Sequence, residues 1–219
     1  MNGDIMVDYR ALQKARSIMK TQFGESCTYD WGVELTVRYE DPLVWCYAII
    51  VFLADWNWMY YKGKSSSEVV LSIMEGLCPL LKEVKDIILK FRMLKLDEIQ
   101  YSELEDLKPI IVGLFNRMAK IVGFTGASKV LHLLAPSFFM MWDDKIREHY
   151  GVGADGDGYY EFLRKMRDEV REAIKSYSRE RGIADYSKAR EELEKNFSKP
   201  LLKVMDEYNY LTFTKKIKF

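Results

Sequence analysis

The sequence predicts an all-α protein. Apolar residues recur at helical spacing along most of the 219-residue chain, and several segments begin with helix-capping residues. Residues 31–39 alternate apolar and polar side chains as a strand does, but no second convincing strand is available to pair with them. A lone strand leaves its backbone hydrogen bonds unsatisfied. We therefore expect a helix or an extended linker there, and about nine or ten helices in all.

A central apolar helix is expected over residues 42 to about 59. Asp41 is suited to the N-cap of this helix, and Pro42 is suited to its first turn. The segment is apolar nearly all round, which is typical of a helix at the centre of a core. Its longest apolar run, 43–54, is shorter than the roughly 20 residues that a bilayer span needs, so we expect no membrane association.

Two capping boxes mark further helix starts. Ser65 with Glu68, and Ser102 with Glu105, have the spacing at which a hydroxyl and a carboxylate cap the first turn reciprocally. Pro79 is expected to kink or split the first of these helices.

The second half of the chain is expected to contain shorter helices and one long helix. Short helices are predicted at 126–135 and 144–150, and a long one at 159–179. A soft boundary falls in the glycine-rich loop near residue 155. The apolar stripe of the long helix must nevertheless pack on something, so we expect all 219 residues to form one domain.

The charge balance limits the classes of partner. Lys and Arg together number 33, as do Asp and Glu, so the formal net charge is zero. This argues against a broadly basic nucleic-acid-binding protein, although a local basic patch stays possible.

The cysteines favour a particular cellular compartment, and the low amide content favours a particular kind of source organism. Cys27, Cys46 and Cys78 are widely spaced, odd in number and without a zinc-ligand pattern, so we expect reduced thiols and a cytoplasmic protein. Gln is rare whereas Lys, Glu and Tyr are abundant, which favours a thermophilic, archaeal source.

Polar and special-backbone residues are concentrated between residues 123 and 145. The segment Gly123-Phe-Thr-Gly126-Ala-Ser128-Lys129 contains a glycine-punctuated turn followed by a helix start. A Lys beside a helix start feels the positive end of the helix dipole, which favours its neutral, nucleophilic form. Lys129 and Asp143 are the predicted catalytic residues, and the predicted binding residues are Gly123, Gly126, Ser128, His132 and Asp144.

At these residues the chain resembles the helix-hairpin-helix DNA glycosylase superfamily, over roughly 30 of its 219 residues. Gly123 and Gly126 would correspond to the hairpin glycines, although they are one residue further apart than in that family. The resemblance implies that hairpin amides hold a DNA phosphate and that a base is flipped out. It also implies that Lys129 attacks the sugar while Asp143 stabilises the developing positive charge.

A second interpretation involves no catalysis. Asp143 would cap a helix, His132 would bond a backbone carbonyl, and Lys129 would be solvated, in a helical module for partner binding or self-association into a homo-oligomer. No cofactor is expected. His132 and His149 are the only histidines, so a multi-histidine metal centre is impossible, although a carboxylate-rich magnesium site stays conceivable.

Overall fold

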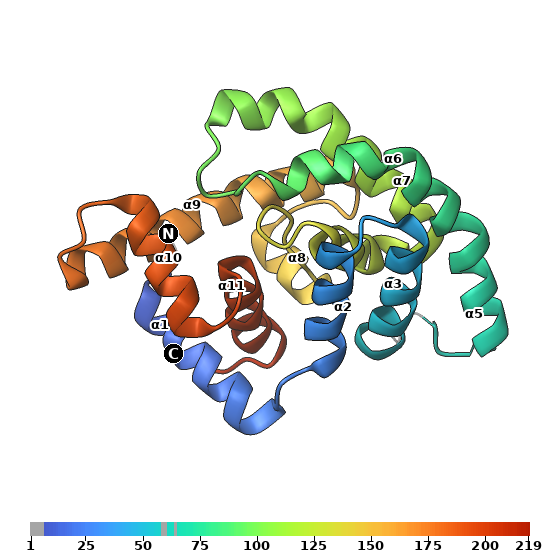
Figure 1. The fold of residues 1–219 in the computed structure, drawn as a ribbon. Coiled ribbons are helices and arrows are strands. Elements are labelled where there is room, and N and C mark those ends of the chain that lie inside the picture. The colour runs from blue at the N-terminus through green and yellow to red at the C-terminus, as the bar shows by residue number, and fades with distance from the viewer. Residues whose placement is uncertain (1–6, 58–60, 64) are drawn as a thin grey trace.

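The computed structural model describes residues 7–57, 61–63 and 65–219 (Figure 1). The protein is 78% helical, and the described residues contain no strand, which confirms the all-α prediction. Short π-helical turns extend α1 and α11 and join α5 to α6. The α-helices are α1 (Tyr9–Ile18), α2 (Cys27–Arg38), α3 (Pro42–Trp56), α5 (Ser66–Ser72), α6 (Cys78–Arg92), α7 (Tyr101–Leu134), α8 (Asp144–Tyr150), α9 (Gly156–Arg181), α10 (Tyr186–Phe197) and α11 (Leu201–Asn209).

The ambiguous segment 31–39 belongs almost entirely to α2, which settles it as helical. The buried positions of α2 are Tyr29, Gly32 and Thr36, which recur at helical spacing. A Cβ atom on Gly32 would stand 3.0 Å from the side chain of Leu133 in α7, so the glycine permits close packing of the two helices. The large apolar side chains that alternate with polar ones in this segment lie partly at the surface of α2.

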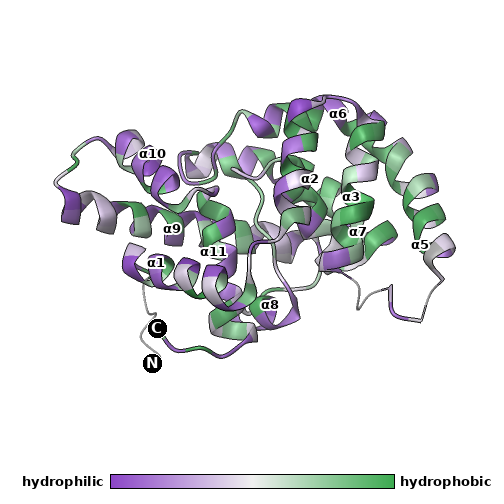
Figure 2. Ribbon diagram, turned by 60° about the horizontal axis from the view of Figure 1, so that its bottom comes forward, coloured by the Kyte–Doolittle hydropathy of each residue, from purple (hydrophilic) through white to green (hydrophobic). Residues whose placement is uncertain are grey.

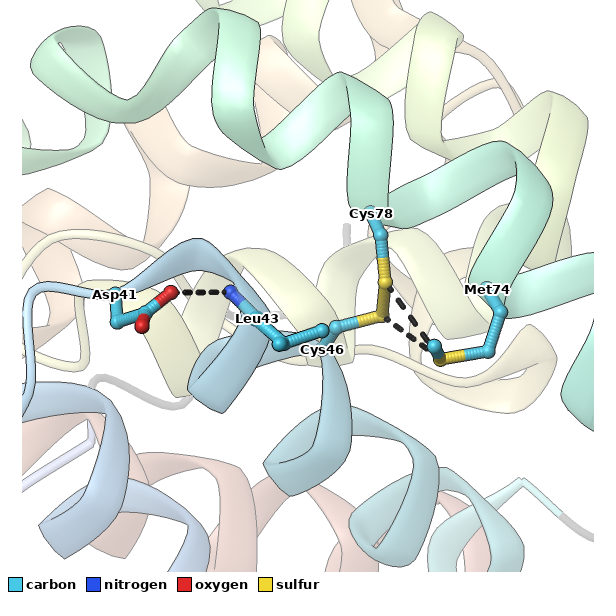
Figure 3. The surroundings of a disulfide bond; sticks show 5 residues. All are labelled: Asp41, Leu43, Cys46, Met74 and Cys78. Carbon is cyan, nitrogen blue, oxygen red and sulfur yellow. Dashed lines mark hydrogen bonds between the residues drawn. A yellow bond between two sulfur atoms is a disulfide. The ribbon is translucent and has the colours of Figure 1, made fainter.

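The start of α3 is as predicted. Asp41 accepts a hydrogen bond from the backbone N–H of Leu43 at 2.8 Å (Figure 3). The helix packs against α2, α6 and α7, and its ribbon is largely hydrophobic (Figure 2). Its outward face nevertheless leaves Leu43, Tyr47 and Val51 exposed. The last residues of the predicted helix, 58–60, lie outside the described residues.

The capping box at Ser65 and Glu68 is confirmed, with both reciprocal hydrogen bonds present. The helix it opens passes through a π-helical turn at Ile73–Leu77 and continues as α6, whose first turn contains Pro79. The wider turn just before the proline is the irregularity that the sequence predicted, since a proline cannot donate to the preceding turn.

The second predicted capping box is wrong by two residues. The cap of α7 is Gln100, whose partner is Glu103, so the helix begins before Ser102. The carboxylate of Glu105 instead accepts a hydrogen bond from the hydroxyl of Tyr160 in α9 at 2.6 Å.

A disulfide joins Cys46 of α3 to Cys78 at the start of α6, with their Cα atoms 5.6 Å apart (Figure 3). The two sulfurs lie 3.9 and 3.8 Å from the sulfur of Met74, as van der Waals contacts, because disulfide sulfurs carry no hydrogen. The expectation of three reduced thiols is therefore wrong, and Cys27 alone stays free among the described residues. Disulfides are typical of oxidising compartments and also of intracellular proteins of hyperthermophiles.

The buried apolar side chains form one continuous cluster to which helices from α1 to α11 contribute. The loop near residue 155 does not separate two cores. The N–H of Gly156 donates to the side-chain oxygen of Asn116 in α7 at 2.9 Å, and a Cβ atom on Gly156 would lie 2.7 Å from the carbonyl oxygen of Val112. The start of α9 therefore packs directly against α7.

Among the described residues, α7 is the one helix long and apolar enough to cross a membrane by length and composition alone. It also packs against α2, α3, α6 and α9. The absence of membrane association stays a prediction.

Candidate functional site

The backbone of α7 breaks at Gly123, where φ is 76° and ψ is 166°. This left-handed φ favours glycine, and the helix resumes at the next residue in a new direction. The break is therefore present, but the predicted turn through Gly126 is not. Gly126 is buried, and a Cβ atom there would stand 3.0 Å from atoms of both Asn57 and Val122. Its predicted binding role stays a prediction, although the interior encloses this residue.

Ser128 is fully buried and holds the chain that follows α7 in place. Its hydroxyl donates to the carbonyl oxygen of Thr125 at 2.9 Å and accepts from the backbone N–H of Trp142 at 3.2 Å. The side chain is enclosed and both contacts are internal, so the structure gives Ser128 a structural role, and its ligand-binding role stays a prediction. It instead ties the segment that ends at Asp143 to α7.

His132 is also fully buried, and both ring nitrogens are engaged. Nδ1 donates to the carbonyl oxygen of Phe139 at 2.7 Å, so Nε2 accepts from the hydroxyl of Tyr29 at 2.9 Å. Burial lowers the pKa of His132 to about 3, although the carbonyl contact opposes this shift. The imidazole is therefore a neutral group with structural contacts, and the binding role predicted for it stays a prediction.

This histidine should make folding acid-sensitive. The unfolded chain takes up the proton near pH 6.5, whereas the folded protein takes it up only near pH 3, so acid favours unfolding. The stability that the neutral imidazole of His132 contributes is fully present above pH 6.5 and is lost as the pH falls toward 3. We expect His132 to account for about 2–3 kcal/mol of the stability lost between pH 7 and pH 4.5.

Urea denaturation at both pH values checks this expectation. His132→Gln cannot titrate, so the loss of unfolding free energy on acidification should be smaller in this variant than in the wild type. Equal losses in the two proteins would show that His132 is protonated without penalty in the folded state.

Lys129 points toward a cavity of about 580 Å³, which also receives the side chain of Asp143. Its amine donates to the carbonyl oxygen of Trp56, the last residue of α3. Burial lowers the pKa of Lys129 to about 8, while the carboxylates of Asp206 and Asp143 oppose this shift. The structure therefore brings the two predicted catalytic residues to one cavity, without an ion pair between them in the part of the chain described.

Asp143 has both carboxylate oxygens engaged. Oδ1 accepts from the N–H of Ile146 at 2.8 Å and so caps α8, and Oδ2 accepts from the hydroxyl of Thr214 at 2.6 Å. Its neighbour Asp144 lies at the surface, with its side chain 76% exposed and 3.7 Å from Arg147. Asp144 does not line the cavity, so the structure does not bring it together with Lys129 and Asp143 there, and its binding role stays a prediction.

Several cavity residues were missed in the sequence, and three of them are charged residues on α11: Lys203, Asp206 and Glu207. The amine of Lys203 lies 3.0 Å from Asp206 Oδ2 and 3.4 Å from Glu207 Oε1. All three residues are buried, and burial raises the pKa of both carboxyls. Burial also disfavours the Lys203 ammonium, but the two carboxylates outweigh it and raise the pKa of that amine. The sequence did contain one signal for these three residues, which is the spacing of charges at positions i, i+3 and i+4 on an otherwise apolar helix.

The charge cluster extends from α11 to the N-terminal helices. Arg16 of α1 contacts Glu207 at 3.3 Å and Glu25 at 2.5 Å. Lys203 also lies 4.8 Å from the ring centre of Trp56, within range of a cation–π interaction. Carboxylates outnumber amines at the cavity, which is therefore acidic: they are Glu25, Asp55, Asp143, Asp206 and Glu207, against Lys129 and Lys203.

Comparison of the chain with protein-family models, with curated proteins and with solved structures finds no match.

Proposed function

We propose that the cavity is an active site in which the amine of Lys129 attacks an electrophilic carbon, in the manner of a bifunctional DNA glycosylase. The supporting observation is the placement of Lys129 at a cavity with a pKa lowered to about 8. A lysine in this range keeps a useful fraction of neutral amine at neutral pH, which nucleophilic catalysis requires. Asp143, at the same cavity, would stabilise positive charge that develops on the sugar.

The corresponding reaction at an abasic nucleotide is imine formation. The neutral amine adds to the C1 aldehyde of the opened sugar, the carbonyl π bond breaks, and a carbinolamine forms. Loss of water then gives the imine, which borohydride reduces to a stable secondary amine that links protein and DNA.

The charge of the cavity limits which part of a nucleic acid enters it. Its five carboxylates oppose the entry of phosphates, so only a base- or sugar-sized group is admitted while the backbone stays outside. Phe23, Trp56, Trp142 and Tyr210 supply aromatic surface on which such a group could stack.

Borohydride trapping tests the proposal. We expect a covalent adduct between the wild-type protein and a duplex that contains an abasic site, and its loss in Lys129→Gln. Lys145→Gln is the matched control, because Lys145 lies on α8 close to Asp143 but is exposed and paired with Glu148 at 2.9 Å. An adduct that persists in Lys129→Gln, or disappears equally in Lys145→Gln, would refute the assignment.

A phosphate-free aldehyde such as 2-deoxyribose belongs in the same experiment. Trapping of deoxyribose on Lys129 without trapping of the duplex would retain the nucleophile and reject DNA as the substrate. Failure of both substrates would reject the active site.

A non-catalytic function is the second candidate, and one observation favours it. Lys129 satisfies the terminal carbonyl of α3, which is a structural role by itself. The exposed side chains of Leu43, Tyr47 and Val51 on α3 would suit partner binding or homo-oligomer formation. A mass that rises with concentration in sedimentation, together with no adduct, would favour this function.

A further inference from the structure

The carboxylates that face Lys129 differ in how many of their oxygens already accept a hydrogen bond. Asp143 accepts hydrogen bonds on both oxygens, from Ile146 and Thr214. Asp206 is 7% exposed and uses Oδ2 for Lys203, while no hydrogen bond reaches its Oδ1 from the described residues. It lines the same cavity as Lys129.

We infer that Asp206, rather than Asp143, is the proton-transfer partner of Lys129. Asp206 takes the proton that the Lys129 ammonium must lose before it can attack, and returns it when the hydroxyl leaves. This role rests on the imine chemistry proposed above, but the state of the Lys129 amine can be measured without any substrate.

The proton balance closes over the two steps. The Lys129 ammonium gives one proton to the Asp206 carboxylate, and the neutral amine forms the new N–C bond while its own proton moves to the carbonyl oxygen. The Asp206 carboxyl then protonates the departing hydroxyl, and water leaves. The products are an iminium on Lys129, water and a restored carboxylate, so no other reactant is needed.

Among the charged groups around Lys129, Asp206 has the largest electrostatic effect on its amine. Charged groups face the amine from three elements: Asp55 on α3, Asp143 before α8, and Asp206 with Lys203 on α11. Asp206 is the strongest of the carboxylates that favour the ammonium, and Lys203 opposes it. Burial also raises the pKa of Asp206, which makes it a better proton acceptor than an exposed carboxylate.

Competitive acetylation followed by peptide mass spectrometry measures the neutral fraction of each lysine. With a pKa of about 8, about one Lys129 amine in ten is neutral at pH 7, so labelling can rise at most about tenfold. We expect Asp206→Asn to raise Lys129 labelling several-fold toward this limit, and to move its pH profile to lower pH. Asp143→Asn should produce a smaller change.

Glu207→Gln is the matched control. It removes a buried carboxylate of the same cluster that pairs with Lys203 and is not among the leading charges on Lys129, so it should change Lys129 labelling much less than Asp206→Asn does. Asp206→Glu keeps a carboxylate and should restore the wild-type pH profile. General loosening of the fold would instead raise the labelling of many lysines in both Asp206→Asn and Glu207→Gln.

Borohydride trapping distinguishes failure of the proton-transfer role of Asp206 from failure of the proposed function. Faster acetylation of Lys129 with slower imine formation in Asp206→Asn would support the proton-transfer role, because a purely structural defect would not produce opposite changes. Lys129 labelling that is unchanged in Asp206→Asn, or changed more in Asp143→Asn, would overturn it. If the wild type traps no aldehyde, the proposed function and the catalytic part of this role fail together, whatever the acetylation result.

Discussion

Asp97→Ala is expected to lower the free energy of unfolding by about 3–5 kcal/mol, because it removes the buried carboxylate from a buried guanidinium and leaves only the partly exposed Glu194 as its ion-pair partner. Asp97 is fully buried in the loop between α6 and α7, and Arg190 of α10 is 2% exposed. Arg190 Nε lies 3.1 Å from each carboxylate oxygen, and the hydroxyl of Tyr186 donates to one of them at 3.1 Å. The pair joins α10 to the loop between α6 and α7.

Chemical denaturation monitored by far-UV circular dichroism measures the change. The control is Glu194→Gln, which removes the other, partly exposed partner of Arg190 and should cost less. Asp97→Leu combined with Arg190→Met should recover most of the loss, since apolar replacements leave no buried charge. A loss below about 1 kcal/mol in Asp97→Ala would show that water reaches Arg190.

Replacing Cys46 and Cys78 together by Ala is expected to cost about 3–4 kcal/mol. The bridge closes a loop whose ends are 32 residues apart, and a cross-link of that length removes considerable chain entropy from the unfolded state. A reducing agent should lower the urea midpoint of the wild type by a similar amount and leave the double variant unchanged.

Cys27→Ala is the control for that experiment, because Cys27 is exposed and free. It should change the unfolding free energy by less than about 0.5 kcal/mol. A wild-type midpoint that does not respond to reductant would mean that the two cysteines remain thiols in solution.

Local signals in the sequence were sufficient for much of the fold. Asp41 and Ser65 were assigned correctly as caps because a cap depends on residues within one helical turn. Gln100 was missed because glutamine is not among the preferred N-cap residues. The pairing of Cys46 with Cys78 could not be predicted, since it depends on how α3 and α6 meet in space.

The candidate site was predicted only in part. Lys129 and Asp143 lie close in sequence and share a polar segment, so their approach to one cavity could be anticipated. The burial of Ser128 and His132 could not be predicted, because a helical pattern distinguishes faces but does not show that both faces of a segment are covered. Asp206 lies far along the chain, and only tertiary packing brings α11 to the cavity.

The packing of α11 against α1 has a consequence for biosynthesis. A ribosome that has released the chain only as far as α9 has delivered Lys129 but none of the α11 charges around it. During that interval Lys129 is an ordinary hydrated lysine in an open half of the core, and Arg16 lacks its contact with Glu207. The low pKa of Lys129 and the charge cluster around it therefore develop only after α11 has been synthesised and has packed against α1.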